Sequence, residues 1–259
     1  MIGFLDIDGL RIRYKQAGQG APILLLHGWG GQVESVDPIA NALAQQFAIT
    51  SIDFPGHGES SLPPRAWHVS DFLDATLKVM DRLELPQPGI VAHSFGGRVS
   101  IKLAAQYPQR AGRILFTAGA GVVPPASIAK RFKRLVGATA GKLRTAAHAA
   151  APSTDAFVER LGERLFPYLA SSDYKNAGEL RETLRFVVAE DLTSLLHKIQ
   201  SKCLLVWGDQ DQETPLYCGE TMKRLIPGAE LVVFAGAGHF PYVDQMNKFN
   251  MLALKFFRE

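Results

Sequence analysis

The sequence lacks the features that mark several large classes of protein. It contains only two cysteines, Cys203 and Cys218, and no CxxC pair, which excludes a disulfide framework and favours two reduced structural thiols. No apolar run approaches the roughly 18 residues that a membrane-spanning helix requires. The first residues lack a basic stretch followed by an apolar one, so we expect no signal peptide and a cytoplasmic protein.

Cofactor signatures are also missing. The seven histidines are scattered and no HExxH motif occurs, so no metal site is predicted. A glycine-rich stretch at residues 28–31 follows a strand-like run, but it lacks the GxGxxG spacing of a dinucleotide-binding turn. We therefore predict a protein without a metal or nucleotide cofactor.

Charge of either sign is modest. The formal net charge is +3, which is far from the concentrated basic field of nucleic-acid-binding proteins, so no nucleic-acid partner is expected. The densest basic group lies opposite an apolar helical stripe at residues 128–135, and it is interpreted as the solvated face of an amphipathic helix. A basic rim that attracts anionic substrates is the alternative. The basic residues opposite the stripe are Lys130, Arg131, Lys133 and Arg134, and Lys142 and Arg144 follow them in the chain.

What the sequence does contain is an alternation of strand and helix patterns. Short apolar runs bounded by turn residues alternate with stretches of helical spacing, which predicts a mostly parallel sheet covered on both faces. Strands are predicted at residues 12–14, 22–26, 48–53, 89–92, 113–117, 203–207 and 231–234. Helices are predicted at residues 39–47, 72–83, 95–107 and 249–257.

The alternation is interrupted once. Residues 122–200 contain no strand-like run and carry amphipathic helical stripes at residues 128–136, 157–165 and 180–187. We interpret them as an all-helical cap inserted into a core made of residues 1–121 and 201–259. Such an insertion would cover the carboxyl edge of the sheet, where folds of this class bind ligands.

Three side chains at that edge form a nucleophilic constellation. Ser94 follows a strand directly and precedes a helix, and the small residues Gly96 and Gly97 suit a sharp turn that exposes its hydroxyl. His239 lies among glycines after the last predicted strand, and Asp211 follows the strand before it. Serine needs a histidine base, and the base needs an acid that fixes its tautomer, so these residues are predicted to converge.

The motifs in this order resemble the α/β-hydrolase superfamily along nearly the whole chain. The resemblance implies an eight-stranded α/β-hydrolase sheet and an oxyanion hole made by the backbone N–H groups of Trp29 and Phe95, with His27 and Gly28 supporting the turn. The matching segments are residues 27–31 (HGWGG), 53–60 (DFPGHGES), 92–97 (AHSFGG), 207–211 (WGDQD) and 238–241 (GHFP).

The resemblance also ranks the acids. Relatives place the acid four residues before a proline, and Pro215 favours Asp211 over Asp209. The rival position, after the strand before the cap, has no carboxylate. Asp53 and His57 are interpreted as bracing the site from the side. One departure is Ala92, where relatives carry glycine, and a small local adjustment is expected there.

These features predict a serine hydrolase that cleaves a small-molecule carboxylic ester through an acyl-enzyme. Two alternatives stay open. A carbon–carbon bond hydrolase acting on ring-cleavage products would use the same three residues, and a hydrolase-like receptor or signalling protein would retain them with slow turnover. The sequence predicts neither the acyl chain nor the oligomeric state.

Overall fold

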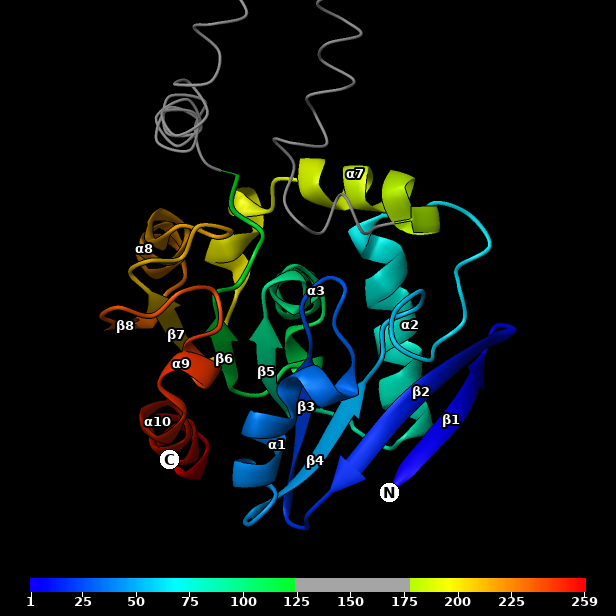
Figure 1. Cartoon of the computed structure of the whole chain (residues 1–259), viewed down its shortest axis with the longest axis horizontal. Helices are drawn as coiled ribbons and strands as arrows, with labels where there is room; N and C mark the ends of the chain where they lie inside the picture. Colours follow the sequence, from blue (N-terminus) through cyan, green and yellow to red (C-terminus); the bar gives the residue numbers. More distant parts are fainter. Residues whose placement is uncertain (124–177) are drawn as a thin grey trace, which may run out of the picture. The chain divides into compact units, whose positions relative to one another are not determined.

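Eight strands form one sheet in the computed structural model, which describes residues 1–123 and 178–259. The strand order is β1-β2-β4-β3-β5-β6-β7-β8 (Figure 1). Strands β1, β2 and β4 pair antiparallel, and every pair from β4 onward is parallel. The predicted eight-stranded, mostly parallel sheet is thereby confirmed. The strands are β1 (Ile2–Ile7), β2 (Leu10–Ala17), β3 (Ala21–Leu26), β4 (Phe47–Ile52), β5 (Gly89–His93), β6 (Ile114–Thr117), β7 (Cys203–Gly208) and β8 (Glu230–Phe234).

Helices cover both faces of this sheet, and an apolar core lies on each side. Helices α2, α3 and α8 pack on one face, and α1, α9 and α10 pack on the other. The helices are α1 (Asp37–Leu43), α2 (Val69–Arg82), α3 (Phe95–Gln106), α7 (Arg181–Ala189), α8 (Leu216–Leu225), α9 (Pro241–Asp244) and α10 (Met246–Arg258), with short 3-10 turns η1 (Val33–Val36), η2 (Pro108–Arg110), η3 (Gly178–Leu180) and η4 (Thr193–Lys198).

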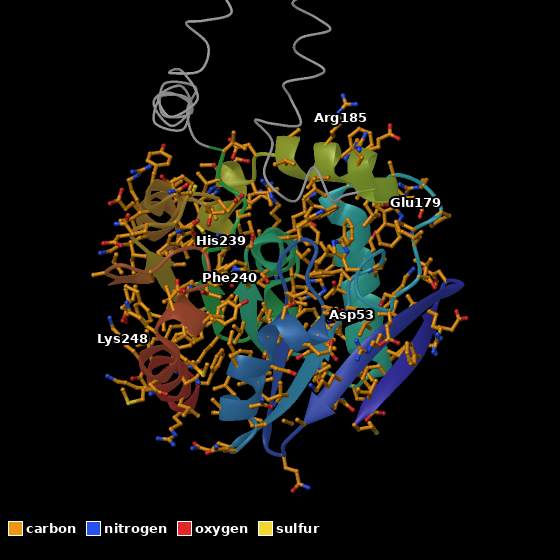
Figure 2. All side chains as sticks on the ribbon, viewed as in Figure 1. Asp53, Glu179, Arg185, His239, Phe240 and Lys248 are labelled. Atoms are coloured by element: carbon orange, nitrogen blue, oxygen red, sulfur yellow. The ribbon has the colours of Figure 1, made fainter. Side chains whose placement is uncertain are left out.

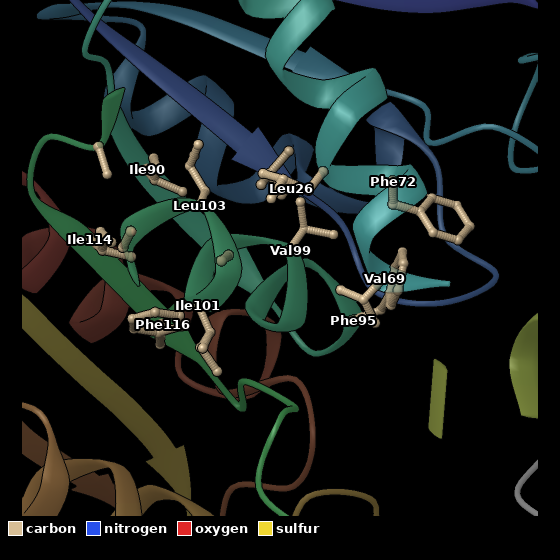
Figure 3. Packing of buried hydrophobic residues seen from close by; sticks show 14 of the residues in the cluster. Leu26, Val69, Phe72, Ile90, Phe95, Val99, Ile101, Leu103, Ile114 and Phe116 are labelled. Atoms are coloured by element: carbon tan, nitrogen blue, oxygen red, sulfur yellow. The ribbon is translucent and has the colours of Figure 1, made fainter. Parts of the chain in front are cut away.

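The central strands are apolar along their whole length because both of their faces are covered. Leu24, Leu25 and Leu26 of β3 are fully buried, on alternating sides of the sheet. Figure 3 shows Val99 and Leu103 of α3 beside core residues of the neighbouring strands. The helix that follows Ser94 is thus fixed firmly on the sheet.

The structure departs from the predicted elements in several places. Strand β1 was not among the predicted strands. Helix α1 ends at Leu43, and Phe47, which the spacing placed in that helix, begins β4. Phe47 is buried in the core on that face, so its apolar character serves the sheet.

Part of the predicted cap can be compared with the structure. The stripe at residues 180–187 is helix α7, whose Leu184 and Val187 are buried. The stripes at residues 128–136 and 157–165, and the basic group from Lys130 to Arg144, lie outside the described residues. The limits 122–200 therefore stay a prediction. In the described part of the chain, no helix is long and apolar enough to cross a membrane.

Both thiols are buried and free. Cys203 lies in β7 and Cys218 in α8. Burial raises the pKa of each thiol to about 12. The two side chains behave as small apolar groups of the core, as the sequence predicted.

Candidate active site

Ser94 occupies the sharp turn between β5 and α3. Its backbone has φ 47° and ψ −111°, a conformation that costs a non-glycine residue roughly 1–3 kcal/mol. The amides of Gly97 and Ala120 both donate to the Ser94 carbonyl at 2.8 Å, and these hydrogen bonds hold the turn. The Ser94 side chain is half-buried, at the carboxyl end of β5.

Small residues are required around this turn because the backbone is tightly enclosed. A Cβ atom on Gly97 would lie 2.9 Å from the Gly119 backbone, and one on Gly96 would collide with the Leu26 carbonyl of β3. Ala92, which departs from the family pattern, is fully buried and pairs in register with Leu26. Its methyl group is accommodated without breaking the strand pairing.

Asp211 and His239 form a direct pair. His239, which is labelled in Figure 2, places Nδ1 3.0 Å from Asp211 Oδ2 and 3.1 Å from Oδ1. The Asp211 side chain is fully buried. A carboxylate can only accept, so Nδ1 carries the proton and Nε2 is left as the basic nitrogen. This is the tautomer that a general base for a serine requires.

Thr214 holds the acid in place. Its amide donates to Asp211 Oδ1 at 3.0 Å, and its hydroxyl lies 2.9 Å from both Asp211 Oδ2 and the Ala118 carbonyl. The amide of Glu213 also donates to Oδ1, at 2.9 Å. The carboxylate is therefore oriented by its own turn, and Thr214 joins that turn to the loop after β6. The sequence interpretation missed Thr214, and its position directly before Pro215 is the only signal that could have indicated it.

Asp209 has a different environment. Its Oδ1 accepts a hydrogen bond from the Gly236 amide at 2.8 Å, which ties the turn after β7 to the turn after β8. Within the part of the chain that the structure describes, it makes no hydrogen bond or ion pair with the His239 ring. The structure therefore brings Asp211, and not Asp209, to the histidine.

The turn after β3 approaches Ser94 closely. A Cβ atom on Gly28 would lie 2.8 Å from His93 Nδ1 and 3.2 Å from Ser94 Cβ, so only glycine fits. Within the described residues, the backbone N–H groups of Trp29 and Phe95 donate to no other group. Two free donors beside a serine are what an oxyanion hole needs.

His27 fixes the backbone of this turn. The Phe54 amide donates to His27 Nε2 at 3.1 Å, so the ring proton is on Nδ1, which donates to the Gly28 carbonyl at 2.7 Å. Burial lowers the pKa of His27 to about 4, so the ring is neutral at ordinary pH. Its two hydrogen bonds join the turn after β3 to the turn after β4.

Asp53 and His57 lie beside the turn and serve its structure. Asp53 Oδ1 accepts from the Val33 amide at 2.6 Å, and Oδ2 accepts from the Glu59 amide at 2.9 Å. His57 donates from Nδ1 to the Pro55 carbonyl at 3.1 Å, and burial lowers its pKa to about 3. The His57 ring packs edge-to-face on Trp29, with 4.7 Å between the ring centroids.

The nucleophile and the base are neighbours without a direct bond. Among the residues described, the Ser94 hydroxyl makes no hydrogen bond with His239. The connection runs through His93, whose ring centroid lies 4.9 Å from that of His239 and whose Nε2 lies 3.0 Å from the His239 carbonyl. Hydrogen bonds in unliganded sites often tighten only when substrate binds. The sequence interpretation assigned His93 no role.

Three comparisons with known proteins bear on this site. A family model described as "alpha/beta hydrolase fold" matches residues 21–245. The chain is 28% identical to a 2-hydroxy-6-oxononadienedioate/2-hydroxy-6-oxononatrienedioate hydrolase of Paraburkholderia phymatum, over 95% of this chain and 91% of the relative.

Solved structures share the fold. A meta-cleavage product hydrolase from Pseudomonas fluorescens IP01 superposes with a TM-score of 0.73 at 23% identity, covering 99% of this chain and 98% of the other. An enol-lactonase from Burkholderia xenovorans LB400 superposes with a TM-score of 0.76 at 21% identity, covering 99% and 100%. At these identities, the structural likeness establishes the fold and not the substrate.

Proposed function

The chain belongs to the α/β-hydrolase family, and from this membership we propose that it is a serine hydrolase that cleaves a carboxylic ester. The observation that carries the proposal is the buried Asp211–His239 pair, with Nδ1 and Oδ2 3.0 Å apart, at the sheet edge where the strained turn presents Ser94. A carboxylate–imidazole pair of this kind activates a serine hydroxyl.

In the first half of the reaction, Ser94 Oγ attacks the ester carbonyl carbon and its proton passes to His239 Nε2. The carbonyl oxygen becomes an oxyanion, which the N–H groups of Trp29 and Phe95 stabilise. Losing one such donor typically costs about 10²- to 10³-fold in rate. The tetrahedral species then expels the alcohol, which takes the proton from His239, and the acyl group stays on Ser94.

In the second half, water replaces the alcohol. His239 Nε2 takes a proton from the water as its oxygen attacks the acyl carbon, and the proton then returns to Ser94 Oγ as the carboxylic acid leaves. Asp211 stabilises the imidazolium form of His239 in both halves. The net change is one ester and one water converted to one acid and one alcohol.

Cleavage of a carbon–carbon bond is the second candidate, because the Paraburkholderia phymatum relative is named for hydrolysis of a 2-hydroxy-6-oxo dienedioate. Water would again supply the hydroxyl of the new acid, but the leaving group would be a carbon that must itself be protonated. The same serine and histidine serve both reactions, so the substrate-binding residues decide between them.

A substrate series tests both candidates. Hydrolysis of p-nitrophenyl esters from acetate to long acyl chains, and of a vinylogous 1,5-diketone, would be measured with the wild type and Ser94→Ala. We expect ester turnover that peaks at one chain length and is lost in the variant. Full ester activity in Ser94→Ala would contradict the proposal, and turnover of the diketone alone would select the second candidate.

A further inference from the structure

We propose that His93 is a positioning residue for the base: its ring N–H holds the main chain of His239, and so sets the approach of the His239 ring to Ser94. This inference rests on the proposed function, since it assigns His239 as the base. His93 precedes Ser94 directly in the chain, while His239 lies 146 residues further on. One hydrogen bond therefore joins the turn of the nucleophile to the loop of the base.

The tautomer of His93 follows from its partner. Nε2 lies 3.0 Å from the His239 carbonyl oxygen, which can only accept, so Nε2 carries the proton and donates. Burial, followed by the nearby His239, lowers the pKa of His93 to about 3. The ring is therefore neutral at ordinary pH, and it adds no positive charge beside the imidazolium that His239 becomes during the reaction.

Packing confines the His93 ring on several sides. The side chain is buried, and its ring centroid lies 4.9 Å from those of His239 and Phe240 and 5.2 Å from that of Tyr242. On another side, the glycine at position 28 leaves just enough room for His93 Nδ1. A ring held in this way has little freedom to rotate, so its N–H points in a fixed direction.

His239 is consequently held at two separate points. Asp211 fixes Nδ1 of its ring, and His93 fixes its backbone carbonyl. The contact with Asp211 sets the direction of the ring, and the contact with His93 sets the position of the backbone that carries it, so both together define where Nε2 lies. Position matters because a displacement of about 1 Å at a catalytic group can cost roughly 10²-fold in rate.

Two variants of matched size separate the donor from the packing. His93→Gln keeps an amide N–H at about the distance of Nε2 from the backbone, whereas His93→Met has similar length and volume but no donor. Tyr242→Phe is the control. It keeps a ring in the same cluster but removes a different hydrogen bond to a backbone carbonyl, the one that the Tyr242 hydroxyl donates to Ser35 at 3.2 Å. If His93→Met does not fold, His93→Asn replaces it as the variant without the hydrogen bond, because the asparagine side chain is too short for its amide to reach the His239 carbonyl.

The readout is the second-order rate at which a fluorophosphonate labels Ser94, with kcat and KM on the best p-nitrophenyl ester and the thermal midpoint of each variant. We expect His93→Met to lower the labelling rate and kcat about 10- to 100-fold with KM little changed. His93→Gln should recover most of that loss, and Tyr242→Phe should keep wild-type rates while losing stability.

Equal rates in His93→Met and His93→Gln would overturn the inference, and so would wild-type rates in both. Failure of the proposed function looks different. In that case the wild type itself would not be labelled, or Ser94→Ala would be labelled as fast as the wild type.

Discussion

At the scale of single residues, the turn after β7 separates two carboxylates that differ by two positions. Asp211 contacts the His239 ring, while Asp209 accepts a backbone amide from the neighbouring turn. One residue thus acts on the base and the other on the loop. The sequence favoured Asp211 through its spacing from Pro215, and the structure supplies the contact.

Asp211→Asn should lower kcat about 10³- to 10⁴-fold with the fold intact, because the asparagine amide can donate to His239 Nδ1 and favour the wrong tautomer. Asp209→Asn is the matched control, and its kcat should fall no more than a few-fold, because only the hydrogen bond between the turns after β7 and β8 is weakened. Both are checked by kcat on a p-nitrophenyl ester and by circular dichroism. Equal losses in the two variants would rule out Asp211 as the only orienting acid.

The sequence could indicate Ser94, Asp211 and His239 because each follows its own strand within a short motif. It could not indicate Thr214 or His93, whose roles depend on remote partners. The Thr214 hydroxyl meets a carbonyl 96 residues away, and the His93 ring meets one 146 residues away. Such contacts are created by the fold and leave no local pattern.

At the scale of elements, α3 has two functions. It begins at the strained turn of Ser94, and it also binds the carboxyl end of α7. Arg98 Nη1 donates to the Glu190 carbonyl at 2.6 Å, at the carboxyl end of α7, where a cation is favourable for the helix dipole. Lys102 Nζ lies 2.6 Å from Glu190 Oε1 and 2.5 Å from Ser70 Oγ. The helix of the nucleophile therefore also fixes the end of α7.

Lys102→Met should lower the free energy of unfolding by about 1–3 kcal/mol, because it removes the ammonium that pairs with the Glu190 carboxylate and donates to Ser70. The double variant Lys102→Met/Glu190→Leu should lose less stability than the sum of the losses in the two single variants. Urea unfolding of all four proteins gives the coupling energy. Strictly additive losses would show that the ion pair does not stabilise this junction.

Most elements were predictable from sequence, since seven of the eight strands gave apolar runs or alternation. Strand β1 was missed because it lies at the sheet edge and alternates exposed with partly covered residues, which is a weak pattern. Phe47 was assigned to a helix because its spacing from Leu43 fits both a helix and a following strand. Spacing alone cannot decide between them.

At the scale of the whole molecule, three histidines are buried in the neutral form around the site. Burial lowers the pKa of His27 to about 4, and those of His57 and His93 to about 3. In the unfolded chain, each has a pKa of about 6.5. Below that value the unfolded state binds protons that the folded state excludes, so acid favours unfolding.

Stability should be nearly constant between about pH 7 and pH 8 and should fall from pH 6.5 toward pH 4.5, by up to about 1.4 kcal/mol per pH unit for each histidine. Carboxylates with a lowered pKa, such as Asp71 and Asp191, stabilise the fold while they are ionised, so protonating them reduces stability only at lower pH. Urea unfolding at several pH values measures the slope. His57→Asn should reduce it by about one-third, and an unchanged slope would exclude His57 as a contributor.

The two buried thiols, finally, provide an internal measure of how often the core opens. Cys203 and Cys218 are the only cysteines of the chain, one in the sheet and one in a helix that covers it. Their reaction with a thiol reagent should be limited by opening of the core, so that its rate in water reports how often each layer opens. Faster modification of Cys218 than of Cys203 would mean that α8 detaches before the sheet opens. Equal rates would mean that the two layers open together.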